Sequence, residues 1–528
     1  MLATLHGMSA RHEQTVSGAV PLGRGEVARV LGVEPPADAP PDGSKGKITG
    51  VTHDSREAGP GVAFVAVPGF RHDGAEFVPE ALERGAELAV AERGVPGYPV
   101  AVVPDARAAL AALACAVYGD PSHEMEVYGV TGTNGKTTTS YALYSILAGC
   151  GGEEETGLLT TAETIIGGER VDAIRTTPEA TEVQRLLAAM RDSGARRVAM
   201  EVSSHGIALK RVSGVRFAGA LFTNLTRDHL DLHGTMEEYY RAKRELFYRV
   251  VEGGPKLANA DDEHGRRLAR EVEGVTTFGA APDADYRVES VRTEPRGTAF
   301  TLCRGAGAER RLELKTPLLG GYNVMNAAGA ASLALAAGVD DAEVARAVAG
   351  MPQVPGRFER VTARGAGEPG FEVIVDYAHT DVGLEAALGV AREVAAGGRV
   401  ICVFGAAGDR DGAKRPLMGR VAARLSEVAI ITTDDAYSEP PEKIAREVES
   451  GADKGACEVI LDRREAIRRA LSYARRGDVV LVAGKGHERV QHLPGEDVPF
   501  HDATVVGELL GELAGESSER SERSSQGA

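Results

Sequence analysis

The chain has 528 residues, 43% of them hydrophobic and 26% charged, with a formal net charge of -17 and an isoelectric point near 5.4. This length exceeds what one hydrophobic core supports, so about three domains are expected, with the composition of a soluble globular protein. The negative charge argues against a general nucleic-acid or anionic-membrane binder, because phosphates would be repelled.

The cysteines and the apolar runs bear on the compartment. The five cysteines are scattered and include no C-x-x-C pair: Cys115, Cys150, Cys303, Cys402 and Cys457. Neither a disulfide framework nor a zinc site is indicated, and a reducing cytoplasm fits best. The start, MLATLHGMSARHEQ, lacks the apolar core of a signal peptide. The longest apolar run, AALAALACAVY (108–118), is too short to span a bilayer and predicts a buried helix.

The predicted elements begin with short apolar runs such as VAFVAV (62–67), followed by the helix that ends near Tyr118. GDPSHEM (119–125) has turn chemistry and predicts a domain boundary. Strands and helical patterns then alternate, and this alternation favours a parallel sheet covered by helices. The strands predicted there are EVYGVTG, RRVAMEV (196–202) and FAGALFTNL (217–225).

A second boundary is predicted in MPQVPGRFERV (351–361), which carries two prolines and a glycine. Beyond it come FEVIVDYAH, RVICVFGAAGD, EVAIITTDDA and DVVLVAGKGHE, apolar strands that end in small or polar residues. Ligands of open α/β sheets bind at such carboxyl ends. The terminal GESSERSERSSQGA predicts a disordered tail. The predicted fold class is α/β, with an N-terminal α/β domain, a central phosphate-binding domain with a mostly parallel sheet, a C-terminal Rossmann-like domain and the tail, at 1–122, 123–354, 355–514 and 515–528.

The stretch VYGVTGTNGKTTTSYAL departs from the usual phosphate-loop template G-x-x-x-x-G-K-[ST], because Val130 stands where the first glycine should fall. Gly132 and Gly135 would let backbone N–H groups approach an anion, and the following helix favours phosphate at its N-terminus. Lys136 would add a positive charge and Thr137 a hydroxyl for Mg²⁺. The alternative is an ordinary glycine-rich turn, but strand, G-K-T and helix together favour phosphate binding.

A phosphate loop of this kind needs a second metal carboxylate at a neighbouring strand end. Glu201 ends the strand RRVAMEV, and the segment TNLTRDHLDLHG crowds several possible ligands after the next strand: Asp228, His229, Asp231 and His233. Alone, each of these is more typical of a capping or solvated residue. Together they favour a metal-phosphate site.

At this point the motifs resemble those of a family, the Mur ligases, which are ATP-dependent amide-forming enzymes of peptidoglycan assembly. The segments TGTNGKTTT, EVSSHG, NLTRDHLDLHG, YRAKRELF, NVMNAAGA, GRFE, DYAHT and GKGHE match in order over nearly the whole chain. THDSREAGPGVAFVAVPGFRHDG is similar to the uridine-nucleotide site of the members that add the third amino acid to UDP-N-acetylmuramoyl-L-alanyl-D-glutamate. The resemblance implies transfer of the ATP γ-phosphate to a substrate carboxylate, giving an acyl phosphate that an amine attacks. Mg²⁺ and Lys136 would offset the charge of the two anions.

The resemblance also implies a catalytic and metal set. By pattern alone, Lys243 is a charged residue on an amphipathic helix, paired with Glu238 or Glu245. In the family, the matching lysine is carbamylated by CO₂, which replaces an ammonium with an anionic oxygen ligand suited to Mg²⁺. The implied catalytic residues are Lys136, Lys243 and His229. The implied ligands of two Mg²⁺ ions are Thr137, Glu201, His229 and the Lys243 carbamate.

Further contacts are implied only by this resemblance, because each short polar residue alone would be more typical of a turn or cap. The implied ATP contacts are Gly132, Thr133, Asn134, Gly135, Lys136, Thr137, Thr138, Asn326, Arg357 and Asp376. The implied contacts to the uridine substrate are Ser55, Phe70, Arg71, His72, Thr176, Thr177, Ser203 and Arg211. The implied amino-acid contacts are Arg410, Asp434, Asp435, Ala436, Tyr437, Gly484 and Glu488. Leu209 stands where Gln is often found, so no contact is implied there.

The loop TTDDAYSEPP bears on which amino acid is added. Diaminopimelate-adding members typically carry D-N-P-R, and here Asp435 takes the place of Asn and Tyr437 that of Arg. An Arg can clamp the distal carboxylate of diaminopimelate, whereas Asp435 suits a terminal ammonium. The loop therefore predicts L-lysine or another diamine. The alternative is meso-2,6-diaminopimelate, with an Arg from elsewhere as the clamp.

The motifs argue against three other functions. A folylpolyglutamate synthetase would not need the DSRE…GFRHDG block, a P-loop switch or motor would not need GKGHE and DYAHT together, and a non-catalytic binding protein would not keep the whole metal set. The expected partners are the uridine dipeptide, an amino acid and ATP. The chain is expected to be a cytoplasmic monomer that binds no nucleic acid and does not insert into membranes.

Overall fold

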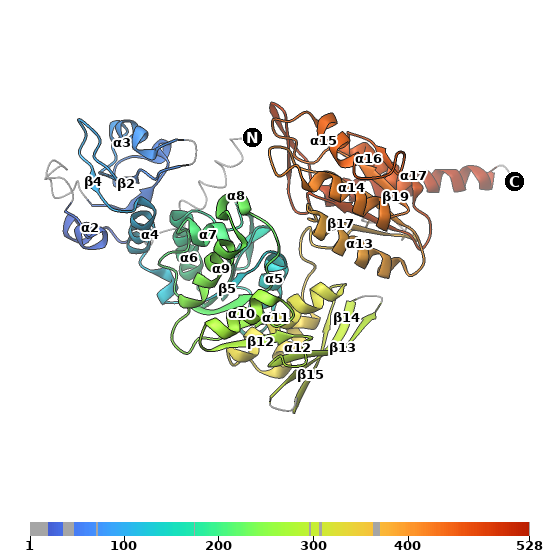
Figure 1. Cartoon of the computed structure of the whole chain (residues 1–528), viewed down its shortest axis with the longest axis horizontal. Helices are drawn as coiled ribbons and strands as arrows, with labels where there is room; N and C mark the ends of the chain where they lie inside the picture. The colour runs from blue at the N-terminus through green and yellow to red at the C-terminus, as the bar shows by residue number, and fades with distance from the viewer. Residues whose placement is uncertain are drawn as a thin grey trace. The chain divides into compact units, whose positions relative to one another are not determined.

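The structure is a computed structural model that describes residues 19–34, 47–69, 72–173, 175–294, 297–305, 309–362 and 370–526 (Figure 1). It forms two compact units. The first comprises 1–292, 299–316 and 322–351, and the second 293–298, 317–321 and 352–528. Among the described residues, no helix is long and apolar enough to cross a bilayer.

The N-terminal part of the first unit is a four-stranded parallel sheet in the order β1-β2-β3-β4. The alanine-rich run predicted to be a buried helix is α4, and Leu110, Leu113 and Val117 on it pack into the core of this sheet. The strands are β1 Gly50–Thr52, β2 Val62–Val65, β3 Leu88–Ala91 and β4 Ala101–Val102. The helices are α2 Arg24–Leu31, α3 Val78–Glu83 and α4 Ala106–Val117.

The central sheet has eleven strands in the order β15-β14-β13-β12-β11-β10-β5-β9-β6-β7-β8, and β5 pairs in parallel with β9 and β10. The predicted strand that precedes the phosphate loop, β5, thus lies between the two predicted strands that follow the loop, β9 and β10. The strands are β5 Glu126–Thr131, β6 Thr156–Leu159, β7 Glu163–Ile166, β8 Glu169–Asp172, β9 Arg197–Glu201, β10 Phe217–Phe222, β11 Lys256–Asn259, β12 Val275–Gly279, β13 Tyr286–Glu294, β14 Gly297–Arg304 and β15 Arg310–Thr316.

Helices accompany this sheet as expected for a strand–helix alternation. The longest of them are α5 and α11, and both are largely buried and apolar. The helices are α5 Lys136–Gly151, α6 Ala180–Asp192, α7 Ser204–Ala208, α8 Leu230–His233, α9 Met236–Tyr248, α10 Glu263–Glu271, α11 Gly321–Ala336 and α12 Asp341–Ala349.

The second unit contains a six-stranded sheet in the order β16-β17-β21-β18-β19-β20, parallel except for the edge strand β16. Its strand side chains alternate between two cores: Ile374 packs with α13 to α15, whereas Val373 and Val375 pack with α16 and α17. The strands are β16 Glu359–Arg360, β17 Glu372–Asp376, β18 Val400–Phe404, β19 Val428–Ile431, β20 Cys457–Val459 and β21 Val479–Ala483, followed by the hairpin β22 Val490–Leu493 and β23 Glu496–Pro499. The helices are α13 Asp381–Ala395, α14 Lys414–Leu425, α15 Pro441–Glu449, α16 Arg463–Tyr473 and α17 Asp502–Gln526. The predicted α/β fold class with parallel sheets is confirmed.

The C-terminal tail differs from the prediction. The sequence predicts disorder for 515–528, but α17 continues to Gln526. Helix α17 begins with turns whose Val506 and Leu509 are buried in the core, so the extension adds to an existing helix rather than nucleating one. The tail has no proline, and Glu516 and Glu519 each precede an Arg by four residues, a spacing that supports helix.

Candidate active site

The phosphate-loop candidate follows β5 and leads into α5, whose N-cap is Gly135. Gly132 and Gly135 have φ of 151° and 83°, and a Cβ on either would lie 1.8 Å from Thr223 Oγ1 or 2.3 Å from Asn326 Oδ1. The loop is held on β10 because Asn134 N donates to Asn224 Oδ1 at 3.0 Å. Only glycine fits these two positions, which brings the loop backbone close to its neighbours.

Lys136 and Thr137 start α5 and both face Glu201 at the end of β9. Thr137 Oγ1 donates to Glu201 Oε2 at 3.0 Å, and Lys136 Nζ lies 3.8 Å from Glu201 Oε1 while donating to Thr133 O at 2.9 Å. The buried Glu201 Oε2 also accepts from Thr161 Oγ1 at 3.0 Å. The structure therefore joins the predicted lysine, hydroxyl and carboxylate in one cluster, since β5 and β9 are adjacent parallel strands.

Lys243 is on α9 and is only 1% exposed. Its Nζ donates to Gly132 O at 2.6 Å and lies 4.7 Å from the centre of the Tyr239 ring. Burial, and then the positive charge of Lys136, lowers the pKa of Lys243 well below its ordinary value. The alternative of a surface ion pair with Glu238 or Glu245 does not describe this lysine, because its ammonium nitrogen points into the loop.

His229 lies between β10 and α8 with φ of 52°, an uncommon conformation for a side chain of this size. Its ring centroid is 4.6 Å from that of His205, and its Nε2 is 3.4 Å from Asp228 Oδ2. Burial lowers the pKa of His229 to about 4. His233 Nε2 is 3.0 Å from Ser204 Oγ and its ring stacks on Tyr239. The side chain of Asp231 lies outside the described residues.

A second network meets Glu201 from its backbone side. Thr177 Oγ1 donates to Glu201 O at 3.3 Å and accepts from Ser203 N at 3.0 Å, and Arg211 NH1 donates to Thr177 O at 3.1 Å. Thr176 Oγ1 lies 3.0 Å from Thr161 Oγ1, and because the only hydroxyl proton of Thr161 goes to Glu201, Thr176 is the donor in this pair. Four of the predicted contacts to the uridine substrate, Thr176, Thr177, Ser203 and Arg211, match the part of the family site that holds the dipeptide. Together with Thr161 and Glu201 they form one hydrogen-bonded group beside the phosphate loop.

The described N-terminal candidates lie in segments that connect the elements of the N-terminal domain, outside the strands of its sheet. Ser55 is buried and its Oγ donates to Glu80 Oε2 at 2.9 Å, while His72 lies in a loop with its ring 6.3 Å from Phe77. Phe70 and Arg71 lie outside the described residues.

The remaining nucleotide candidates are divided between the two units. In the first, Asn326 Oδ1 accepts from Thr139 Oγ1 at 3.3 Å, directly behind the phosphate loop. In the second, Arg357 stacks 4.3 Å from the Tyr377 ring centre. Asp376 accepts from Phe358 N at 2.7 Å, and burial raises its pKa.

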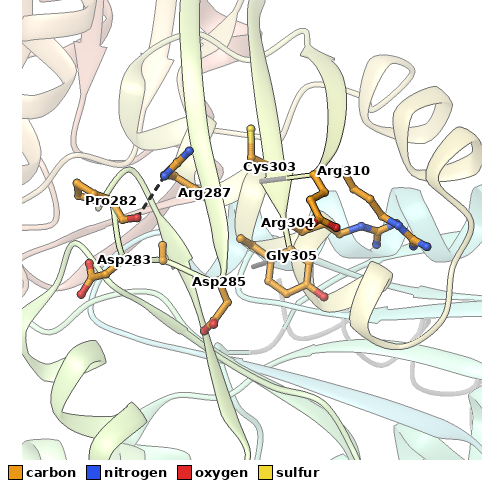
Figure 2. A pocket seen from close by; sticks show the side chains of 11 residues that line it. Pro282, Asp283, Asp285, Arg287, Cys303, Arg304, Gly305 and Arg310 are labelled. Carbon is orange, nitrogen blue, oxygen red and sulfur yellow. Dashed lines mark hydrogen bonds between the residues drawn. The ribbon is translucent and has the colours of Figure 1, made fainter. Parts of the chain in front are cut away.

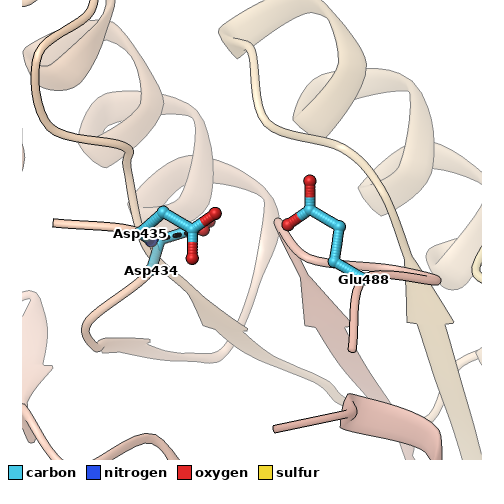
Figure 3. Close-up of side chains that lie close together, drawn as sticks. All are labelled: Asp434, Asp435 and Glu488. Carbon is cyan, nitrogen blue, oxygen red and sulfur yellow. Dashed lines mark hydrogen bonds between the residues drawn. The ribbon is translucent and has the colours of Figure 1, made fainter. Parts of the chain in front are cut away.

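The amino-acid candidates gather at the carboxyl ends of β18, β19 and β21. Ligand oxygens of Asp434, Asp435 and Glu488 lie within 4.8 Å of one another (Figure 3). Lys485, which belongs to the run 484–488 that the resemblance matches to amino-acid contacts, donates to Asp435 Oδ1 at 2.7 Å and to Glu488 Oε2 at 3.0 Å. Gly484 has φ of 117°, and a Cβ there would lie 2.3 Å from Asp434 Oδ2.

Tyr437 takes the place of the Arg of the D-N-P-R motif, and another arginine, Arg410, lies beside it. The Arg410 guanidinium is 5.4 Å from the Tyr437 ring centre, and Tyr437 stacks on His492 at 5.2 Å. Tyr437 has φ of 47°, and its N donates to His492 O at 3.0 Å. Ala436, which carries no polar side chain, is buried in the core. Thus Tyr437 presents its face to a cation that could meet a carboxylate.

Several structural partners were missed by sequence reasoning. Thr161 and Tyr239 contact the phosphate-loop cluster, the latter through its hydroxyl 3.2 Å from Thr133 Oγ1. Arg463 and Asp502 form a fully buried ion pair. Arg463 also donates to the backbone carbonyl of Ala483. A polar residue directly after a strand, as in TGLLTT, is the signal that could have identified Thr161. Patterns on a helix carry no such signal for Arg463.

Figure 2 shows a pocket lined by residues of β13, β14 and the adjoining turns, and none of its lining residues is a predicted site residue. Two of its arginines already have partners, since Arg304 pairs with Asp341 and Arg287 with Glu289. Cys303 donates to Glu289 Oε2 at 3.4 Å. We assign no ligand to this pocket.

Comparison with known families gives three matches along the chain. The Mur ligase family catalytic domain matches 47–118, the Mur ligase middle domain 130–334, and the Mur ligase glutamate ligase domain 356–486.

Among curated relatives, a UDP-N-acetylmuramoyl-L-alanyl-D-glutamate–2,6-diaminopimelate ligase of Streptomyces coelicolor is 43% identical over 510 residues, covering 93% of this chain and 96% of the relative. A ligase of the same name from Geobacillus thermodenitrificans is 43% identical over 474 residues, covering 88% and 95%. A solved structure with that name has a TM-score of 0.65 at 27% identity, covering 94% of this chain and 99% of that one. MurF from Acinetobacter baumannii, at 20% identity and a TM-score of 0.64, shares the fold.

Proposed function

The chain belongs to the Mur ligase family, and we propose that it adds a diamino acid to UDP-N-acetylmuramoyl-L-alanyl-D-glutamate in peptidoglycan synthesis. It is an ATP-dependent amide-forming ligase. The observation that carries the proposal is the position of Glu201. Its side chain contacts Thr137 and Lys136 of the phosphate loop, and its carbonyl accepts from Thr177 of the proposed dipeptide network.

This arrangement suits phosphoryl transfer to a carboxylate. A carboxylate is a poor electrophile, and phosphorylation turns one of its oxygens into a leaving group for the attacking amine. Arg211 and Ser203 would orient the dipeptide, and Lys136 would reduce the repulsion between its carboxylate and the γ-phosphate. The loop glycines would let N–H groups face the phosphates.

The residues around the loop fit Mg²⁺, because Thr137 and Glu201 offer hard oxygen donors that already lie 3.0 Å apart. Bound Mg²⁺ would neutralise phosphate charge as it does in other phosphoryl-transfer enzymes. We propose His229 and Lys243 as ligands of a second ion.

Lys243 fits that role only after a change of charge, because an ammonium would repel a cation. Its burial and its Gly132 O contact hold the nitrogen beside the loop, and the lowered pKa favours the neutral amine that CO₂ requires. We propose that Lys243 is carbamylated.

For the incoming amino acid, the relatives favour meso-2,6-diaminopimelate, the alternative, over L-lysine, the first choice of the sequence analysis. The lysine prediction assumed that Asp435 is free to bind an ammonium. Instead, Asp435 is paired with Lys485, and Arg410 lies beside Tyr437. Arg410 is therefore our candidate for the carboxylate clamp that Tyr437 cannot provide. Because ATP and uridine nucleotides are the substrates, we place the reaction in the cytoplasm.

The test is ligation with purified protein, ATP, Mg²⁺ and the uridine dipeptide, offering diaminopimelate, L-lysine and L-ornithine separately and reading product mass. We expect the mass of the dipeptide plus one diamino acid, with diaminopimelate the best substrate, and no product from Lys136→Ala. Absence of any amino-acid adduct from the wild type would refute the proposal. A parallel reaction with a folate and L-glutamate tests the folylpolyglutamate alternative.

A further inference from the structure

Lys485 is a buried charge at the centre of the amino-acid candidates. Its side chain is 0% exposed, although it lies in the loop that follows the carboxyl end of the interior strand β21. Its ammonium donates to Asp435 and to Glu488, which belong to two separate loops. A buried ammonium is stable only when such partners replace its water.

The two carboxylates differ in how far they are committed to the protein. Asp435 Oδ1 also accepts from His492 N at 3.0 Å, and its side chain is 7% exposed. Glu488 is 32% exposed and is held by Tyr377 OH at 3.2 Å from its Oε1. Lys485 thus pairs with two carboxylates, of which Asp435 is buried and Glu488 is partly exposed to solvent.

The formal charges around Lys485 do not cancel. Three carboxylates, those of Asp434, Asp435 and Glu488, share the cluster with one ammonium, and the neighbouring Arg463–Asp502 pair is balanced within itself. Burial alone would lower the pKa of Lys485, yet Glu488, Asp434 and Asp435 raise it. The lysine therefore stays charged and offsets part of a negative surplus.

We propose that Lys485 is a positioning residue that sets the charge seen by the distal end of the incoming diamino acid, and so determines the choice between diaminopimelate and lysine. The inference rests on the proposed function. The distal end of diaminopimelate carries an ammonium and a carboxylate, whereas that of lysine carries only an ammonium. Every unit of negative charge added to the cluster disfavours the first relative to the second.

The two partners of the ion pair therefore have opposite effects. Lys485→Met leaves Asp435 and Glu488 without their ammonium, so diaminopimelate loses relative to lysine. Asp435→Asn, which keeps the size of the side chain, removes a negative charge, so diaminopimelate gains. In the double variant the two changes offset each other. A residue that only held the loop in place would reduce the use of both amino acids together.

The experiment is a competition of equimolar diaminopimelate and L-lysine for the uridine dipeptide and ATP, with the two product masses giving the ratio of kcat/KM values. We expect the diaminopimelate-to-lysine ratio to fall by about tenfold in Lys485→Met and to rise by about tenfold in Asp435→Asn, with the double variant near the wild type. The exposed Lys454→Met is the matched control and should keep the wild-type ratio.

The outcomes separate this inference from the proposed function. If the wild type forms neither product, the proposed function fails. If the wild type is active but Lys485→Met leaves the ratio unchanged, or shifts it toward diaminopimelate, the role of Lys485 is refuted. If Lys485→Met does not fold, Lys485→Gln, which lacks the charge but can still donate to Asp435 and Glu488, provides the same test.

Discussion

Among the residues that the structure describes, two lysines are almost completely buried, and their surroundings differ. Lys243, in the first unit, donates to a backbone carbonyl and faces an aromatic ring, with the positive Lys136 nearby. Lys485, in the second unit, donates to two carboxylates. Burial lowers the pKa of the first, whereas the carboxylates raise that of the second despite its burial.

The difference shows that burial alone does not decide the charge of a lysine. Carboxylate partners keep a buried ammonium charged, and without hydrogen bonds to them a neutral amine is favoured. A neutral amine is a nucleophile and can react with CO₂, whereas a paired ammonium can only organise its neighbours. The same residue type is therefore suited to chemistry in one unit and to electrostatic positioning in the other.

The largest effect is expected from removing the reactive lysine. Lys243→Ala should lower the rate of ligation by about a thousandfold, since it removes a proposed metal ligand next to the transferred phosphate. Added formate or acetate should restore part of the rate by supplying the missing carboxylate. The measurement is phosphate release that depends on all three substrates. Activity near that of the wild type would make Lys243 a packing residue.

Stability should change in opposite ways when each lysine becomes methionine. Lys485→Met leaves two carboxylates without their cation and should cost roughly 3–5 kcal/mol of unfolding free energy. Lys243→Met removes an amine that must lose its proton or remain an unpaired charge, so stability should be kept or increased. Urea unfolding at pH 7.5 in buffer without bicarbonate measures both. A similar loss of unfolding free energy in Lys485→Met and Lys243→Met would show that the carboxylate partners of Lys485 do not make its contribution to stability different from that of Lys243.

A smaller effect concerns pH near Lys243. Burial, aided by His205, Lys136 and Lys243, lowers the pKa of His229 to about 4, whereas an unfolded histidine titrates near 6.5. Between these values the unfolded state binds a proton that the folded state refuses, so the contribution of His229 to stability is complete above pH 6.5 and is lost as the pH falls toward 4. His229→Asn should flatten this part of the profile. Urea midpoints from pH 4 to 8 provide the comparison, and identical slopes would count against it.

The smallest effect on stability is expected for a lysine that pairs with carboxylates but is exposed to solvent. Lys443 donates to Glu439 at 2.5 Å, yet its side chain is 51% exposed. Water screens such a pair, so Lys443→Met should leave the unfolding midpoint unchanged within error. If Lys443→Met lost as much unfolding free energy as Lys485→Met, the ion pair itself, and not its burial, would determine the contribution to stability.

Much of the candidate active site could be proposed from the sequence because its residues lie close together along the chain. Gly132, Gly135, Lys136 and Thr137 are consecutive or nearly so, and glycines after an apolar strand indicate a phosphate loop by their own conformational freedom. Glu201 was predictable because it ends a strand, and parallel strands place their carboxyl ends at one edge. The α/β fold class followed from the same alternation of strands and helices.

The surroundings of the buried charges were decided only by the tertiary structure. Lys243 contacts Gly132, 111 residues away, and its helix pattern had equally allowed an exposed ion pair. Asp435 is neutralised by Lys485, 50 residues away, so reading its charge from the loop alone favoured L-lysine. The sequence determines which side chains can carry a charge. Whether each of them is charged depends on its exclusion from solvent and on its distance to opposite charges. Both of these depend on contacts between residues that lie far apart in the sequence and meet only in the folded protein.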